Sequence, residues 1–162
     1  MKTSDSIFLR ALNKESLEIP PIWYMRQAGR YMPEYRAVRK KFKNFLDMCK
    51  NPEVCCELAL QPINAFNLDA SILFSDILTI PDAFGLGVEF LEGEGPVFKN
   101  PIKTPKDISS LPEFNSDDLS YVYEAVSNIK RALPKNIPLI GFCGSPWTFC
   151  LLYTSPSPRD RT

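Results

Sequence analysis

The sequence predicts an α/β fold in which short strands run parallel and helices connect them. Compact apolar runs at residues 69–76 and 138–142 are typical of buried strands, and apolar residues at helical spacing mark residues 33–46 and 117–133. The resulting order, strand, helices, strand, helices, strand, implies parallel strands with right-handed crossovers. About three strands are visible, so the chain is either the first half of an eight-stranded barrel or a small open sheet. The order of the elements does not choose between these two.

The first elements follow from local patterns. Residues 22–25 form a short apolar run after two prolines, which predicts a buried strand. From Pro33 to residue 46 the apolar residues share one helix face, with lysines and arginines on the other, which predicts a single amphipathic helix. Asn51 and Pro52 then resemble a helix cap and a first-turn proline. We expect this second helix to run through Leu58 and to be bent or interrupted at Pro62.

The later elements are also predicted from short sequence patterns. Residues 69–76 predict a strand covered on both faces, whose end suits a functional side chain. Residues 85–90 and 93–98 are two extended pieces with a glycine turn between them, which predicts an inserted β-hairpin rather than a phosphate loop. A helical turn begins near residues 104–107, a longer helix follows at 117–133, and residues 138–142 form the third strand.

Composition limits the classes of function. The 162 residues are 44% hydrophobic and 23% charged, as in one globular domain or part of a larger one. Lysine plus arginine (19) equal aspartate plus glutamate (19), which argues against a general nucleic-acid binder or a basic membrane-surface protein. No apolar run resembles a signal peptide or reaches the length of a bilayer span. We therefore expect a cytoplasmic protein with no nucleic-acid or membrane partner.

Cysteine and histidine usage narrows the chemistry. The five cysteines are odd in number and contain no C-x-x-C pair, so we interpret them as reduced, mostly packing thiols. Histidine is absent, which removes histidine-containing triads and histidine-rich zinc sites from this chain. Chemistry here must use carboxylates, arginines, tyrosines or the backbone. The cysteines are Cys49, Cys55, Cys56, Cys143 and Cys150.

The most informative segment is MRQAGRYMPEY, at residues 25–35. Arg26 and Arg30 stand four apart around a small Ala-Gly step, and Gly29 gives the backbone freedom to turn there. Guanidinium groups bind carboxylates and phosphates through paired hydrogen bonds. The pattern therefore predicts a receptor for an anionic ligand. The alternative is that both arginines are exposed, ion-pairing residues.

Asp76 is the candidate functional residue at the end of the predicted strand at 69–76. The pair Ser75-Asp76 before an apolar stretch also fits the start of a helix. The residues alone leave capping and ligand binding equally open.

Three segments closely resemble the uroporphyrinogen decarboxylase family: PIWYMRQAGRYMPEYR at 21–36, LDASILFSDILTIPDAFGLG at 68–87 and PLIGFCGSPWT at 138–148. The resemblance runs from about residue 7 to residue 148. It implies the first half of a (β/α)8 TIM barrel, with parallel strands and the inserted hairpin, from an enzyme that is commonly a homodimer. It also implies decarboxylation of the four acetate arms of uroporphyrinogen III to give coproporphyrinogen III, without a metal or organic cofactor.

The same resemblance assigns site residues. Residues 26–30 would bind substrate carboxylates, and Asp76 would accept hydrogen bonds from pyrrole N–H groups and stabilise the cation formed when a pyrrole carbon is protonated. Arg26, Arg30 and Asp76 would be catalytic. Phe45 and Arg39 are weaker candidates, since Phe45 also lies on the amphipathic stripe and Arg39 on a solvated basic face. The expected substrate-binding residues are Arg26, Gln27, Ala28, Gly29, Arg30, Asp76, Phe45 and Arg39.

The end of the chain departs from the family pattern. The family's substrate-binding tyrosine would fall at position 152, which is Leu152 here. We expect residues 1–148 to be the N-terminal part of the barrel and residues 149–162, which resemble translated adapter sequence, to be a non-native or disordered tail. We expect the 162-residue chain itself to be inactive.

Two other functions remain open. The first alternative is a non-catalytic product that binds porphyrinogen or the full-length enzyme. The second is a cobalamin-linked methyltransferase of the same barrel superfamily, whose members need thiolate or imidazole metal ligands.

Overall fold

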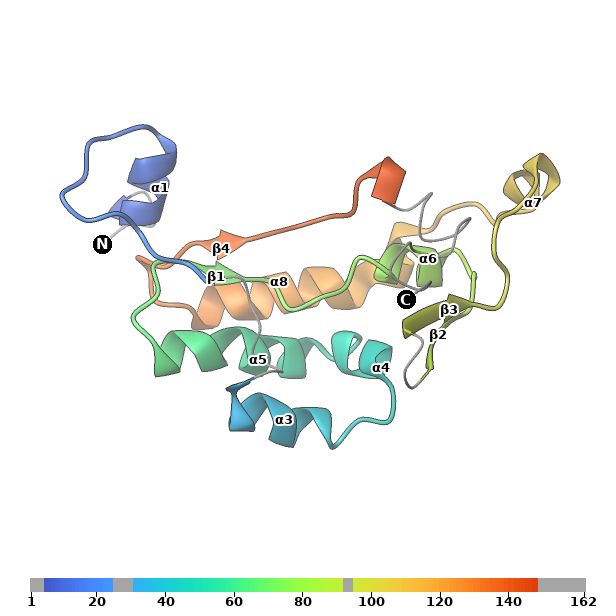
Figure 1. Ribbon diagram of the computed structural model, residues 1–162, viewed down its shortest axis with the longest axis horizontal. Coiled ribbons are helices and arrows are strands. Elements are labelled where there is room, and N and C mark those ends of the chain that lie inside the picture. Colours follow the sequence, from blue (N-terminus) through green and yellow to red (C-terminus); the bar gives the residue numbers. More distant parts are fainter. Residues whose placement is uncertain (1–4, 25–30, 92–94, 149–162) are drawn as a thin grey trace, which may run out of the picture. The chain divides into compact units, whose positions relative to one another are not determined.

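The computed structural model describes residues 5–24, 31–91 and 95–148, which form two compact units (Figure 1). The first unit contains the chain up to Ser75 together with Tyr121–Phe142, and the second begins with Asp76–Ser120. Each unit is described separately. The predicted tail at 149–162 lies outside the described residues.

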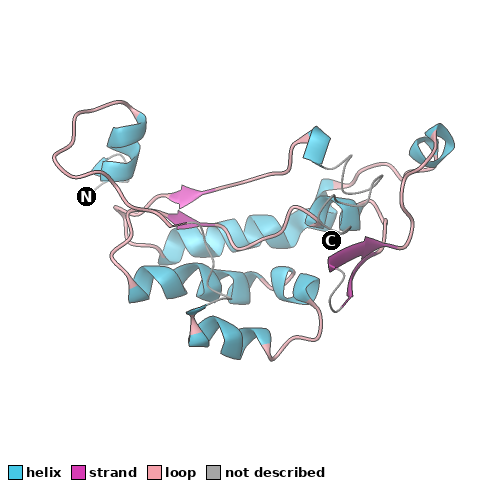
Figure 2. Ribbon diagram, in the orientation of Figure 1, coloured by secondary structure: helices cyan, strands magenta, loops and turns pink. Residues whose placement is uncertain are grey.

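The first unit pairs two parallel strands and covers them with helices. Ser71 lies opposite Leu139 and Ile72 opposite Ile140. Because the paired strands are parallel, the chain between them must cross over, as the element order predicts. The unit contains α1 (Ile7–Leu12), α3 (Pro33–Arg39), α4 (Phe45–Cys49), α5 (Pro52–Ala65), β1 (Ser71–Ile72), nearly all of α8 (Ser120–Ala132) and β4 (Leu139–Ile140) (Figure 2).

The strands are shorter than predicted. Backbone bonds extend the β1–β4 pair by one step at each end, from Ser71 N–H to the Pro138 carbonyl and from Leu73 N–H to the Ile140 carbonyl, both at 3.0 Å. The predicted strand at 22–25 is wrong for residues 22–24, which have no strand conformation. Asp69 N–H donates to the Ile22 carbonyl at 2.9 Å, but Ile22 N–H donates to the Asp69 carboxylate at 2.7 Å. The Asp69 carboxylate thus accepts the hydrogen bond that a backbone carbonyl would accept in a β-ladder, and the pairing does not continue along the chain.

The single helix predicted at 33–46 is also wrong, because the chain turns between α3 and α4. The Phe42 N–H donates to the Arg39 carbonyl at 3.2 Å, and the Asn44 side chain accepts from Leu46 N–H at 2.9 Å. An asparagine cap of this kind supplies the acceptor that the first turn of a new helix needs. The apolar spacing continues across the break, which is why the pattern conceals it.

Helix α5 begins as predicted and continues past Pro62. Asn51 accepts from Val54 N–H at 3.1 Å, which confirms the cap. The helix runs through Leu58, as predicted, and passes through Pro62 to Ala65, so an interruption at Pro62 is wrong. Proline removes one intrahelical hydrogen bond. Burial of the preceding turn, where Leu58 is 1% exposed, offsets this loss.

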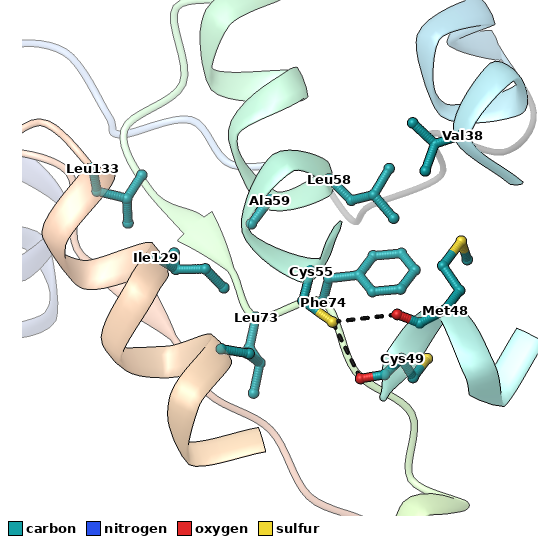
Figure 3. Close-up of a cluster of buried hydrophobic side chains, with 11 residues drawn as sticks. Val38, Met48, Cys49, Cys55, Leu58, Ala59, Leu73, Phe74, Ile129 and Leu133 are labelled. Atoms are coloured by element: carbon teal, nitrogen blue, oxygen red, sulfur yellow. Dashed lines mark hydrogen bonds between the residues drawn. The ribbon is translucent and has the colours of Figure 1, made fainter. Parts of the chain in front are cut away.

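One hydrophobic cluster holds the first unit together (Figure 3). Its side chains come from α3, α4, α5, α8, the residue after α8 and the two residues after β1, and they point toward one another. The buried Cys55 thiol donates to the Cys49 carbonyl at 3.2 Å, which ties α5 to α4. The cluster consists of Val38, Met48, Cys49, Cys55, Leu58, Ala59, Leu73, Phe74, Ala125, Ile129 and Leu133.

The second unit confirms the predicted hairpin and helical turn. It contains α6 (Thr79–Ala83), the antiparallel strands β2 (Val88–Leu91) and β3 (Gly95–Phe98), α7 (Pro105–Ser109) and a 3₁₀ turn (Ser116–Leu119) before α8. Gly87 precedes β2 with φ +66°, and a Cβ there would lie 3.1 Å from the Lys99 Cβ. A residue with a side chain would be strained at this position. Thr104 and Asp107 form a reciprocal capping box at the start of α7.

Candidate functional site

Asp76 is fixed by the turn that leads into α6. Its Oδ1 accepts from Leu78 N–H at 2.8 Å, and its carbonyl accepts from the Thr79 hydroxyl at 2.8 Å. This aspartate-centred turn favours the start of a helix and holds the carboxylate in one orientation. The half-buried Asp76 thus stabilises the turn before α6 but does not cap the helix, whose N-cap residue is Leu78 and which has no side-chain cap bond. An ionised carboxylate can accept several hydrogen bonds, and the bond from Leu78 N–H is one of those that Asp76 accepts.

The predicted anion receptor, residues 26–30, lies outside the described residues, while the chain on either side of it is described. Before it, Ile22 pairs with Asp69 as noted above. After it, the Tyr31 ring meets the Phe66 ring edge to face, with centroids 6.3 Å apart. Both flanks are therefore attached to the segment that joins α5 to β1.

A cavity of about 350 Å³ lies beside these flanks. Its walls come from residues 23–24, Tyr31, α5 and the segment from Phe66 to Ile72. The lining is mainly apolar, and none of the described residues that form it is charged. Such a cavity can accommodate apolar surface, and the described part of its wall offers no ionised group for binding a carboxylate or moving a proton.

Phe45 packs inside the first unit. Its ring lies 6.0 Å from the ring of Phe74, and the Tyr35 ring lies 6.1 Å from Phe74 on the same unit. Phe74 is fully buried, two residues before Asp76 in the chain. The half-buried Phe45 thus has the core contact that its position on the amphipathic stripe predicted. Sequence reasoning did not single out Phe74, whose signal was only its place in a continuous apolar run.

Arg39 stabilises the turn between α3 and α4. Its Nη1 donates to the Phe42 carbonyl at 2.6 Å, and the side chain is half-buried. Arg36, by contrast, is exposed. The guanidinium of Arg39 carries further N–H donors, so this bond leaves capacity for an anion.

The structure thus links some predicted site residues and not others. Phe45 and Arg39 lie at the two ends of one turn in the first unit, whereas Asp76 begins the second unit. Among the described residues, no group of three histidine, cysteine or acidic side chains is arranged to hold a metal ion. Within the same residues, no helix is long and apolar enough to cross a membrane.

The pKa values of Asp107 and Cys56, both outside the candidate site, are shifted. Hydrogen bonds from the backbone of Lys103 and from Thr104 lower the pKa of Asp107 in its capping box. Burial raises the pKa of the Cys56 thiol, and the positive charge of Arg131 opposes the shift. Cys49, Cys55, Cys56 and Cys143 are free thiols, and Cys150 lies outside the described residues.

Comparison with known proteins identifies one family. The model of the family described as "Uroporphyrinogen decarboxylase (URO-D)" matches residues 3–157. A uroporphyrinogen decarboxylase of Vesicomyosocius okutanii is 60% identical over 141 residues, covering 87% of this chain and 41% of that protein. A uroporphyrinogen decarboxylase of Legionella pneumophila strain Corby is 55% identical over 163 residues, covering 97% of this chain and 45% of that protein. The chain therefore spans about two fifths of the length of these relatives.

A solved structure extends the comparison to the fold. A methyltransferase from Methanosarcina mazei superposes with a TM-score of 0.69 at 22% identity, covering 96% of this chain and 46% of that one. At this identity the likeness concerns the fold alone.

Proposed function

The chain belongs to the uroporphyrinogen decarboxylase family, carries part of the family's (β/α)8 barrel, and on this basis we propose that it supplies the substrate-carboxylate and pyrrole-binding part of such an enzyme. The reaction is the removal of carbon dioxide from the four acetate arms of uroporphyrinogen III to give coproporphyrinogen III. The observation that carries the proposal is that the family match at 3–157 runs through both the arginine loop and Asp76.

In this proposal the arginine loop anchors the substrate. Arg26 and Arg30 bind acetate or propionate carboxylates through paired, charge-assisted hydrogen bonds. Gln27, Ala28 and Gly29 leave room for the ligand and present polar groups to it. Anchoring at remote carboxylates supplies binding energy that positions the reacting pyrrole.

Asp76 organises the chemistry. Its carboxylate accepts hydrogen bonds from pyrrole N–H groups and stabilises the cation formed when a pyrrole carbon is protonated. The C–C bond to the carboxylate then breaks, carbon dioxide leaves, and the bonding electrons move into the cationic ring. A proton adds to the exocyclic carbon and the ring proton is lost, which leaves a methyl group. The turn at Asp76 supports this role, because a carboxylate already held by Leu78 N–H needs little reorganisation.

Arg39 and Phe45 have supporting roles in the proposal. Arg39 offers its remaining N–H donors to a substrate carboxylate, and Phe45 contributes apolar surface beside Phe74. The full-length protein is proposed to be a cytoplasmic homodimer that needs no cofactor. The 162-residue chain alone is proposed to be inactive, because a closed barrel requires strands beyond those described.

The test is anaerobic incubation of uroporphyrinogen III with the natural gene product that carries this sequence. Oxidation and chromatography of the porphyrins would show coproporphyrin accumulating, with four equivalents of carbon dioxide released. Arg26→Gln and Arg30→Gln should raise KM, whereas the matched change Arg131→Gln on the exposed side of α8 should not. Absence of carbon dioxide release by the folded, unsubstituted gene product would refute the proposed function.

A further inference from the structure

The turn between α3 and α4 carries an unusual concentration of positive charge. Residues 36–43, RAVRKKFK, contain five cations and no acid, in a chain whose formal net charge is zero. We refer to Arg36, Arg39, Lys40, Lys41 and Lys43 as the basic segment.

The cations of the basic segment are not neutralised locally. None of the five forms an ion pair with another described residue, and all except Arg39 are exposed. The adjoining acids, Glu34 and Asp47, are exposed and form no ion pair with the segment. The charges therefore add to one local positive field instead of cancelling.

Helix stabilisation explains only part of this pattern. Arg36 and Arg39 lie in the last turn of α3 and Lys40 at its C-cap, where positive charge interacts favourably with the helix dipole. Lys41 and Lys43 lie beyond the helix. They extend the positive charge along the exposed turn toward α4.

Both ends of the basic segment are connected to proposed substrate-binding residues. Helix α3 begins at Pro33, three residues after Arg30. At the other end Phe45 packs against Phe74 at 6.0 Å, and Phe74 precedes Asp76 by two residues.

We propose that Lys40, Lys41 and Lys43 capture the polycarboxylate substrate electrostatically and raise its rate of entry to the site. This inference rests on the proposed function and adds a role for lysines outside the carboxylate-binding loop. A local field of one sign accelerates association with an oppositely charged ligand. Each decarboxylation removes one negative charge from the ligand, so the attraction is stronger for the substrate than for the product.

The experiment compares two triple variants of the natural gene product. One carries Lys40→Gln, Lys41→Gln and Lys43→Gln. The control carries the same change at three exposed lysines elsewhere, Lys106, Lys130 and Lys135. Initial rates with anaerobic uroporphyrinogen III are measured at about 20 and about 200 mM salt, because the higher concentration shortens the range of the field. Thermal unfolding of both variants confirms that they fold.

The expected result is a change in kcat/KM alone. At low salt the basic-segment variant should lose roughly 3- to 10-fold in kcat/KM with kcat unchanged, and high salt should remove most of the difference. The control should stay near the unsubstituted protein. A loss equal to that of the control, or a loss independent of salt, would overturn the proposal.

Two further outcomes are separable. If the unsubstituted gene product releases no carbon dioxide, the proposed function fails, and the capture role fails with it. If turnover is normal in both variants but the basic-segment variant alone stops binding anionic phospholipid vesicles or RNA, the segment serves a macromolecule and the capture role is wrong.

Discussion

Replacing Asp76 by asparagine or by alanine separates its structural contribution from its proposed chemical one. Oδ1 of Asp76 accepts from Leu78 N–H at 2.8 Å, and the amide oxygen of asparagine can accept the same bond. Alanine removes both the acceptor and the charge. We therefore expect asparagine to preserve the turn before α6 and to lose catalysis, whereas alanine should lose both.

The two effects differ in size. Loss of the side-chain acceptor in this turn costs about 0.5–1.5 kcal/mol of unfolding free energy, so alanine should destabilise by that amount and asparagine by less. Loss of a group that stabilises charge in the transition state costs about 10²- to 10³-fold in kcat, and both variants should show this loss. The Leu78 bond therefore predicts different stabilities for two variants with equally low activity.

Urea unfolding and anaerobic turnover of uroporphyrinogen III measure the two quantities on the same preparations of the natural gene product. Asp76→Ser provides a second control, because a hydroxyl can also accept from a backbone N–H at a turn. If Asp76→Asn keeps more than about a tenth of the activity and Asp76→Ala loses it, Asp76 acts only through the turn and the assigned chemistry is refuted.

Three further predictions concern stability and reactivity. Phe74→Ala should lower the unfolding free energy by about 3–5 kcal/mol, because this ring is fully buried between two others; a urea midpoint that gives less than about 1 kcal/mol would contradict its place in the core. The pKa of Asp107 is lowered by hydrogen bonds, first from the Lys103 backbone, so its stabilisation of α7 is complete above the ordinary aspartate pKa of about 3.9 and is lost as pH falls through the lowered value. Protection of the α7 amides, measured against the intrinsic exchange rate at each pH, should therefore fall below about pH 4, and unchanged protection would argue against the capping box. Iodoacetamide near pH 8 should label the exposed Cys143 before Cys56, whose thiol pKa is raised by burial; equal rates by peptide mass mapping would refute this difference.

Features encoded within a few residues were predictable from the sequence. The Asn51 cap, the Thr104 helix start and the hairpin after Gly87 each depend on backbone groups only a few positions away. Asn44 carried a similar cap signal, but the uninterrupted apolar spacing from Pro33 onward masked it. Hydrogen bonds between neighbouring residues determine where these elements begin, and the spacing of apolar residues alone does not.

Features that depend on distant partners were not predictable. Residues 22–24 are apolar enough for a strand, yet Asp69, far along the chain, supplies the carboxylate that ends their pairing. Pro62 remains inside α5 because neighbouring side chains are buried against other elements. At the candidate site, the turn at Asp76 could be inferred from its sequence, whereas the contact of Phe45 with Phe74 required the fold.

A hybrid enzyme tests the central claim most directly. Residues 7–148 of this chain replace the matching segment of the Legionella pneumophila relative, which is 55% identical, and decarboxylation of uroporphyrinogen III is measured. The account predicts turnover within about 10-fold of the parent, a difference of about 1.4 kcal/mol, and its loss when Asp76→Asn is added. A hybrid that folds like the parent but releases no carbon dioxide would contradict the claim that this chain carries the decarboxylase's substrate-binding part.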